Sequence, residues 1–409
     1  MDCPKLRYGV EALPVEMEGK PMILLRDQLG FSDQPLVMSP AAAQLLMHMD
    51  GSNSLRDLQA LFMRVTGQLI YMEQLQEIQA KLDEHLFLEN ERFHQRVIEE
   101  QDRFAEDPVR RMTHAGLSYQ GEPALLKQEL ASYFLPESGG PGTPQAMAPP
   151  QPLLGLVAPH IDIKAGGACY AHAYKALCES RSPQTWVVLG TGHQPLQNFF
   201  AVTCKDFETP LGTLSCDRQC GEALLQQAPR DLRADEYNHH REHTIEFQAV
   251  FLALCQPNTR IVPMLCSFSH EDWETDQAYI DETAAILREL PATCGYPVGF
   301  LASVDLAHIG PRYGDRFQPH AGTIREHLEA DRDLLATLEN CNPGAFIQNL
   351  RRERNRRRIC GLAPLYVLAK VLEGQARGIV LHHAHTAVDQ QHSFVTFASM
   401  AFFAESAAG

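Results

Sequence analysis

Four segments govern the interpretation of this chain: LLGLVAPH at 153–160, WVVLGTGH at 186–193, VGFLASVDLAH at 298–308 and RRRICG at 356–361. The first three contain apolar runs without polar alternation, which is typical of parallel strands buried on both faces of a sheet. Each ends at a histidine, and the fourth places a cysteine directly before a glycine. Functional groups gather at the carboxyl ends of such strands. The sequence therefore predicts that these side chains meet at one edge of a sheet.

Apolar runs and amphipathic segments alternate along the rest of the chain. We expect strands at Leu153–Val157, Trp186–Leu189, Phe199–Thr203, Arg260–Leu265, Val298–Ser303 and Ser393–Phe403. We expect helices at Ala168–Ser180, Glu242–Cys255, Trp273–Glu289, Thr323–Asn340 and Leu362–Glu373. Strands separated by helices predict an α/β fold in which helices flank a central sheet.

Residues 1–107 have a different organisation. β-type runs at Pro21–Leu25 and Gln34–Met38 precede three amphipathic helices, expected at Ala41–His48, Leu55–Thr66 and Met72–His85. Ser39-Pro40 and Ser54 are good helix-starting residues. The segment His85–Phe93 resembles a β-hairpin with its turn at Glu89-Asn90, and Arg96–Asp107 is expected to be a helical connector. Three helices and a hairpin predict a small winged-helix domain; the alternative is a generic three-helix cap or dimerisation domain.

Domain borders follow from these differences. We expect one domain at 1–107 and a second at 108–409, with a Pro/Gly-rich loop, ESGGPGTPQAMAPPQP, at 137–152 inside the second domain. The loop composition is typical of a linker. We nevertheless assign the segment before the loop to the second domain, because that segment shares in a family resemblance of the second domain.

Composition restricts the class of protein. The 35 basic and 51 acidic residues give a formal charge of -16, which argues against nucleic acid as a partner. No segment approaches the roughly 20 consecutive apolar residues of a membrane-spanning helix, and the first residues have no signal-peptide core. The 11 cysteines are scattered, without a CxxC pair, which is typical of reduced thiols. We expect a cytoplasmic protein that binds no membrane.

The strand-end residues His160, His193 and His308, together with Cys360, have the chemistry of a mononuclear metal site. Neutral imidazoles and a thiolate are good ligands for transition metals, and such a site keeps positions open for substrate. Asp305, three residues before His308, can orient that imidazole. A single histidine is more often structural than functional, but three at separate strand ends favour a site.

The chain also resembles a known family. The segments that carry the resemblance are THAGLSYQGEPALLKQELASYF (113–134), GLVAPHIDIKAGGACYAHAYKAL (155–177), VVLGTGHQPL (187–196), ETPLGTL (208–214), EHTIEFQAVFL (242–252), SVDLAHIG (303–310) and RRICGLAPLYVL (357–368). They occur in the order found in the Memo family, in the bacterial form called AmmeMemoRadiSam system protein B. That fold is similar to class III extradiol ring-cleaving dioxygenases. In residues 1–107, the strings MDGSNSLRDLQALFMRVTG and LDEHLFLEN resemble PqqD-like winged helices, which recognise a peptide or partner enzyme.

The Memo resemblance implies roles for particular residues. Metal binding falls to His160, His193 and Cys360, and acid/base catalysis to His308 assisted by Asp305. His243 and Glu246 match polar residues that line the same cleft, and the resemblance implies that they contact substrate or support the ligands.

The resemblance also implies a cofactor and partners. Fe(II) is the expected metal, with Zn(II) or Cu(I) as alternatives because a thiolate is a soft ligand. We expect an iron-dependent oxidoreductase of unknown, aromatic or peptide-derived substrate. A radical-SAM enzyme and an AMMECR-type protein, or a peptide bound by residues 1–107, are the implied partners. Two other functions stay open, a non-catalytic adaptor of that system and a zinc hydrolase.

Two clusters of basic residues can each be interpreted either as functional sites or as polar surface. The run Arg351–Arg358 contains six arginines and either attracts an anionic substrate or forms a solvated helix face. His382, His383, His385 and His392 either form a second metal site or lie on a polar strand surface. We favour the surface interpretation for both.

Overall fold

The computed structural model describes residues 3–27, 29–32, 34–145 and 150–405. By the contacts between its residues, the chain divides into two compact units, Met1–Glu106 and Asp107–Gly409. Among the described residues, no helix is both long enough and apolar enough to cross a membrane.

The first unit is a small sheet followed by helices. Its antiparallel sheet has the order β1 (Val10–Met17), β2 (Lys20–Asp27), β3 (Leu36–Met38). The helices that follow are α1 (Pro40–Ala43) with a 3-10 continuation at Gln44–His48, α2 (Leu55–Thr66), α3 (Met72–Glu84) and α4 (Glu91–Glu106). Leu25, Leu58, Leu75, Leu82 and Phe87 form the centre of its core.

The expected helix starts of this unit are confirmed. The Ser39 hydroxyl accepts a hydrogen bond from Ala42 N, and Pro40 is the first helical residue. Ser54 and Asp57 form a reciprocal capping box at the start of α2. Both arrangements satisfy backbone N–H groups that have no partner within the helix.

The expected hairpin at His85–Phe93 is wrong. Leu88 pairs with Leu6 in an isolated bridge, and Arg7 N donates to Phe87 O at 3.0 Å. The Asn90 side chain then accepts from Phe93 N at 3.0 Å and begins α4. Residues 5–7 therefore pair with this segment, in place of residues 91–93, which the hairpin prediction expected as the second strand. A winged-helix assignment and the likeness to PqqD-like proteins stay predictions.

The second unit is built on a large mixed sheet. Its strand order among the described residues is β12 (His308–Ile309), β14 (Phe394–Ala404), β5 (Leu153–Ala158), β11 (Val298–Ser303), β6 (Thr185–Thr191), β10 (Arg260–Cys266), β9 (Gly212–Cys216), β8 (Asp206–Thr209), β4 (Val109–Arg110). In addition, β13 (Ala376–Ala387) pairs with β14, and β7 (Phe200–Val202) pairs with β10. The central strands β5, β11, β6 and β10 are parallel, so their carboxyl ends share one edge.

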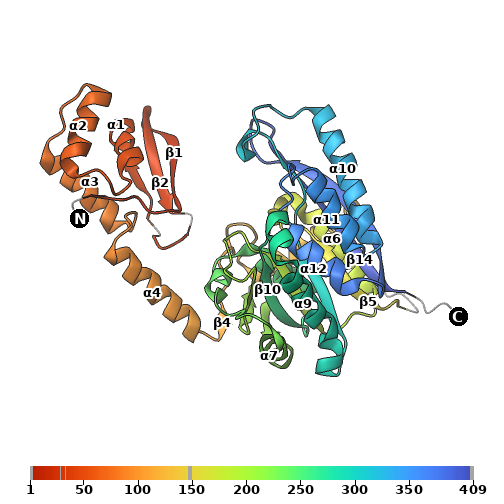
Figure 1. Cartoon of the computed structure of the whole chain (residues 1–409). Coiled ribbons are helices and arrows are strands. Elements are labelled where there is room, and N and C mark those ends of the chain that lie inside the picture. The colour runs from red at the N-terminus through yellow and green to blue at the C-terminus, as the bar shows by residue number, and fades with distance from the viewer. Residues whose placement is uncertain (1–2, 28, 33, 146–149, 406–409) are drawn as a thin grey trace. The chain divides into compact units, whose positions relative to one another are not determined.

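Helices cover both faces of this sheet. One face packs against α5 (Pro123–Ser132), α6 (Ile163–Glu179) and α8 (His243–Cys255). The other packs against α7 (Arg218–Gln227), α9 (His270–Cys294), α10 (Ala321–Glu339), α11 (Pro343–Arg352) and α12 (Leu362–Leu372), and Figure 1 shows α9 and α12 lying together over the strands. Trp186 and Val188 of β6 belong to the first core, whereas Val187 and Leu189 belong to the second. Because both faces are buried, the strands need apolar residues at every position.

The α/β fold expected from the sequence is confirmed, with each expected strand and helix of this unit present. Several elements that lack a long apolar run were missed, among them α5, α7, α11, the β8–β9 hairpin and the His-containing strand β13. In the Pro/Gly-rich loop, residues 139–145 and 150–152 are described as turns and irregular chain with an isolated bridge at Pro152. Residues 146–149 of that loop lie outside the described residues.

Candidate metal centre

The centre lies where three parallel strands end. His160 follows β5 by two residues, His193 follows β6 by two and Asp305 follows β11 by two. Because β11 lies between β5 and β6, these three side chains start from neighbouring positions on one edge of the sheet. His243 reaches the same place from the first residue of α8, and Cys360 from the turn before α12.

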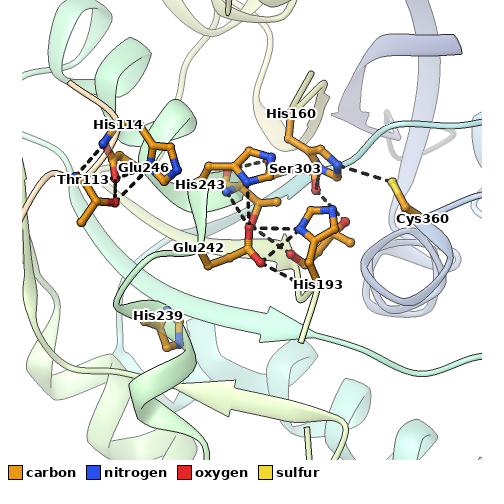
Figure 2. Close-up of polar contacts among 12 residues, drawn as sticks. Thr113, His114, His160, His193, His239, Glu242, His243, Glu246, Ser303 and Cys360 are labelled. Carbon is orange, nitrogen blue, oxygen red and sulfur yellow. Dashed lines mark hydrogen bonds and ion pairs between the residues drawn. The ribbon is translucent and has the colours of Figure 1, made fainter. Parts of the chain in front are cut away.

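Three imidazoles form the cluster at this edge (Figure 2). One potential ligand atom from each of His160, His193 and His243 lies within 4.8 Å of the others. The ring centroids of His160 are 5.2 Å from His193 and 5.5 Å from His243, and those of His193 and His243 are 5.1 Å apart. The sequence placed His160 and His193 together, and the structure brings His243 to them as a third imidazole.

Each imidazole is oriented through its Nδ1 atom. His160 Nδ1 lies 3.0 Å from the Ser303 carbonyl oxygen, so this nitrogen is the donor. Nδ1 of His193 lies 3.1 Å from both carboxylate oxygens of Glu242, and Nδ1 of His243 lies 3.2 Å from Oε1 of that residue. When Nδ1 donates, Nε2 of a neutral ring carries the lone pair. This is the arrangement that metal-binding histidines adopt.

Glu242 is the functional residue that the sequence reasoning missed. It precedes His243 directly and caps α8 by accepting from Thr244 N at 3.2 Å. A carboxylate next to a candidate ligand was a usable signal, but its reach to His193 depends on the fold. Burial would raise the Glu242 pKa, yet hydrogen bonds from His193 and His243 outweigh burial and hold the pKa well below its usual range. Glu242 therefore stays charged and fixes both rings.

Cys360 and Asp305 both lie close to His160. The Cys360 Sγ is 3.4 Å from His160 Nε2 and donates to the Asp305 carbonyl oxygen at 3.5 Å. Asp305 Oδ1 accepts from the backbone N–H groups of His160 and Ile161 at 3.0 and 3.1 Å, and its Oδ2 is 3.6 Å from His160 Nε2. A thiol and a carboxyl group therefore flank the cluster as further potential ligands.

Burial controls the charge of these groups. It lowers the pKa of His160 well below its usual range, and the nearby His193 and His243 lower it further. It raises the pKa of Asp305 to about 7, and it raises that of Cys360 well above its usual range. The lone pair of His160 is therefore free of a proton near neutral pH, as metal binding requires.

His308, expected to be the acid/base residue, is held by backbone groups and not by Asp305 as expected, since the Asp305 carboxylate contacts His160. Its Nδ1 lies 3.0 Å from the Leu306 oxygen and 3.1 Å from the Arg358 oxygen, and its ring contacts Tyr313 edge-on at 5.0 Å. Among the described residues, no hydrogen bond or ring contact joins His308 to the three-imidazole cluster. Its Nδ1 is a donor, so Nε2 is the atom that can accept a proton. Its catalytic role stays a prediction.

Glu246 lies behind the cluster and is completely buried. It forms an ion pair with Arg110 and accepts from Tyr119 Oη at 2.5 Å, from His114 N at 2.9 Å and from Thr113 N at 3.1 Å. Figure 2 shows Thr113 and His114 bonded to this carboxylate. Although burial would raise its pKa, the charge of Arg110 and these hydrogen bonds lower it. With no exposed surface, Glu246 does not line the cleft as the resemblance implied.

A cavity of about 500 Å³ opens beside His193 and Cys360. Its walls include the apolar side chains of Leu196, Phe199, Phe268, Ile359 and Leu362, and its polar lining includes Ser267, Asp272 and Asn355. This volume is within the range of small-molecule sites.

The two weaker clusters have structural partners. Arg357 pairs with Asp331 and Glu353, and Arg358 pairs with Asp315 at 2.7 Å while donating to the His308 oxygen at 3.0 Å. His382 stacks on His172 with ring centroids 4.6 Å apart, and His383 lies 3.3 Å from Asp331. Within the described residues, neither cluster is among the groups that could hold a metal ion.

The α/β fold and the cluster of three imidazoles, two of them oriented by the buried carboxylate of Glu242, define the class of the protein as an α/β protein with a histidine-rich centre. The chain belongs to the Memo family, because the family described as Memo-like protein matches residues 110–401. A MEMO1 family protein of Aquifex aeolicus is 30% identical over 382 residues, which cover 93% of this chain and 96% of that protein. A MEMO1 family protein of Thermus thermophilus is 28% identical over 335 residues, 81% of this chain and 93% of that protein. The Aquifex alignment is longer than the second unit, so it extends into the first.

The Arg110–Glu246 pair gives a prediction about stability. Replacing Glu246 with Gln leaves a buried guanidinium without its counter-charge, so we expect the free energy of unfolding at pH 7 to fall by about 3 kcal/mol. The folded-state pKa of Glu246 is below the ordinary value of 4.5. The stabilisation is therefore present above about pH 4.5 and is lost as the pH falls below it, so wild type and E246Q should converge in acid. Urea unfolding followed by tryptophan fluorescence measures this difference.

The matched control is Glu222→Gln. Glu222 pairs with Arg233 at the surface, where its side chain is 47% exposed, and such pairs contribute about 0–1 kcal/mol. A difference between wild type and E246Q that is small at pH 7, or that grows as the pH falls, would show that the ion pair does not stabilise the fold as described.

Proposed function

We propose that the chain is a mononuclear Fe(II)-dependent oxidoreductase acting on a small organic substrate. The observation that carries this proposal is the set of three imidazoles with engaged Nδ1 atoms beside a thiol and a carboxyl group. Two histidines and one anionic group with open positions are the usual ligands of non-haem iron in oxygenases. Family membership and the cavity beside His193 add support.

The donor atoms fit a divalent transition metal. His160, His193 and His243 would supply Nε2 atoms, and Cys360 or Asp305 would supply the anion. The groups that orient these rings are already in place, since Ser303 O holds Nδ1 of His160 and Glu242 holds Nδ1 of His193 and His243. When bound, Fe(II) would supply the electrons that allow oxygen to react with an organic molecule.

The chain's own residues have separate tasks in this proposal. The apolar walls of the cavity, with Phe199 and Phe268, bind the substrate and exclude water. Asp305 can hold or release a proton at Oδ2 near neutral pH, because its pKa is raised to about 7. His308 would take a proton at Nε2 from a substrate hydroxyl group, since its Nδ1 donates to backbone oxygens.

Metal binding tests the proposal directly. We expect the full chain, loaded anaerobically, to bind about one Fe(II), because one cluster supplies the ligands. His160→Ala and His193→Ala should weaken binding by more than the roughly 10–100-fold that loss of a supporting residue causes. Metal analysis and competition with a chelator measure both effects. His94→Ala, an exposed histidine of the first unit, is the control.

The outcomes separate the alternatives. If the wild type binds no iron, or if His160→Ala binds it equally well, the proposal is wrong. Purification with stoichiometric zinc and no oxygen uptake after iron loading would favour the zinc hydrolase, in which the metal activates water.

The anionic ligand can be identified by spectroscopy. We expect the Co(II)-substituted protein to have a near-ultraviolet thiolate charge-transfer band that Cys360→Ser abolishes, because only a deprotonated sulfur bonded to the metal produces it. Cys266→Ser, a buried thiol that also lines the cavity, is the matched control. A band that persists in Cys360→Ser would exclude Cys360, and loss of Co(II) binding in Asp305→Asn with the band absent throughout would favour the carboxylate.

An adaptor role is the second candidate, and the first unit favours it. A cavity of about 360 Å³ there is lined by Phe62, Leu69, Ile70 and Ile78, and Leu69 is 57% exposed. Apolar surface of this kind is typical of protein recognition. We propose that this unit binds the radical-SAM enzyme, the AMMECR-type protein or a peptide of the same system.

The adaptor role has its own test. We expect the full chain to retain a co-expressed radical-SAM partner in a pull-down, and Leu69→Asp to lose it while keeping its metal, because a charge in the apolar cavity opposes docking. Lys164→Asp, an exposed residue of the second unit, is the control. Equal retention by both variants would count against docking through this cavity.

A further inference from the structure

Arg110 is a completely buried arginine with no place in the chemistry proposed above. It lies in β4, at the start of the second unit. Its guanidinium donates from Nε to His239 O at 3.0 Å, from Nη1 to Arg111 O at 3.0 Å, and from Nη2 to Glu242 O at 2.9 Å and Thr113 Oγ1 at 3.2 Å. Together with the ion pair to Glu246, these bonds engage all three guanidinium nitrogens.

Two of the acceptors bracket one turn of the backbone. His239 ends the 3-10 helix Glu236–His239, and Glu242 is the cap of α8. Residues 239–242 therefore run from one Arg110 hydrogen bond to the other. The side chain of Glu242 extends from this turn and holds His193 and His243 through their Nδ1 atoms (Figure 2). A displacement of the turn would move both rings.

The chemistry of arginine suits this task. Its planar guanidinium presents five donors in fixed directions, whereas a lysine ammonium presents three on a flexible stem. Glu246, one turn along α8 from Glu242, fixes the guanidinium and balances its charge. Glu246 of α8 therefore fixes the guanidinium, and the guanidinium in turn fixes the backbone turn that precedes α8.

We propose that Arg110 is a positioning residue of the metal centre, which holds the backbone of Glu242 so that its carboxylate orients His193 and His243. The inference rests on the proposed function, because it concerns the affinity of the proposed site for its metal. Arg110 acts through Glu242 and contacts neither substrate nor metal.

Metal affinity is the primary measurement. The dissociation constants of Fe(II) and Co(II), obtained by competition with a chelator, should rise about 10–100-fold in Arg110→Lys and Arg110→Met, the usual cost of losing a group that supports metal ligands. Arg111→Ala is the control, since that side chain is 59% exposed and pairs with Asp107 at the surface. Its affinity should equal that of the wild type.

A second variant separates positioning from folding. Arg110→Met leaves the Glu246 charge buried and unpaired, so it will lower the melting temperature for that reason alone. The double variant Arg110→Met/Glu246→Leu removes both charges, and apolar replacement of a buried pair is often tolerated. We expect the metal-free double variant to melt close to the wild type and still to bind metal about 10–100-fold more weakly.

The remaining outcomes overturn the inference. A folded double variant with wild-type metal affinity would show that the turn needs no help from Arg110. If both Arg110→Met and the double variant fail to fold, Arg110 is required for folding and has no separate positioning role. If the wild type itself binds no metal, both the proposed metal centre and this inference are wrong. Equal metal affinities of the wild type and the double variant would overturn the inference about Arg110 but not the metal centre.

Discussion

The carboxylate of Glu242 fixes the orientation of two of the three imidazoles in the centre. It is 7% exposed and accepts hydrogen bonds from the His193 backbone at 3.0 Å, from two imidazole Nδ1 atoms and from Thr244 N. A buried carboxylate without partners would cost several kcal/mol. Here the same hydrogen bonds that offset the cost of burial also choose the tautomer of both rings. Loss of this one charge would free the two imidazoles at once.

The sheet determines which groups reach this carboxylate. Neighbouring strands lie about 4.8 Å apart, and β5, β11 and β6 are neighbours whose registers align Ala158, Ser303 and Gly190. Residues two positions beyond each strand therefore start at similar heights on one edge. His160, Asp305 and His193 occupy these positions. The central strand provides the carboxyl group, while the outer two provide imidazoles on either side of it.

Much of this arrangement follows from the sequence, because apolar runs predict buried strands and the residues after them predict the edge. The part that could not be predicted depends on contacts between distant residues. Glu242 reaches His193 across 49 residues, and the turn that presents it is bonded to Arg110, 132 residues away from Glu242. Nothing in EHTIE shows that its first glutamate faces the imidazoles while its second, Glu246, pairs with a buried arginine.

The error at His85–Phe93 has the same origin. A hairpin needs a partner strand, and local sequence offered 91–93, but Leu6 pairs with Leu88 from 82 residues earlier in the chain. β13 was missed for a different reason. Its histidines break the apolar pattern, yet the strand is ordered by pairing along its length with β14. In both cases tertiary pairing overrides the local pattern.

The charges of the centre also bear on the choice of ligand. Glu242 is ionised and its charge is shared by two imidazoles, and it raises the pKa of His193 despite the opposing effect of burial. Burial raises the pKa of both Asp305 and Cys360, so a second anion in this space is unfavourable.

A divalent cation changes that balance, because its charge stabilises the ionised form of a ligand by several kcal/mol at bonding distance. Ionisation of Cys360 or Asp305 would therefore accompany the binding of a metal, and a single added anion would leave the centre close to neutral. The softer sulfur, 3.4 Å from His160 Nε2, and the harder carboxylate oxygen, 3.6 Å from the same atom, compete for that role. In the proposed site the identity of the metal would decide between them, because soft ions favour the thiolate and harder ions the carboxylate.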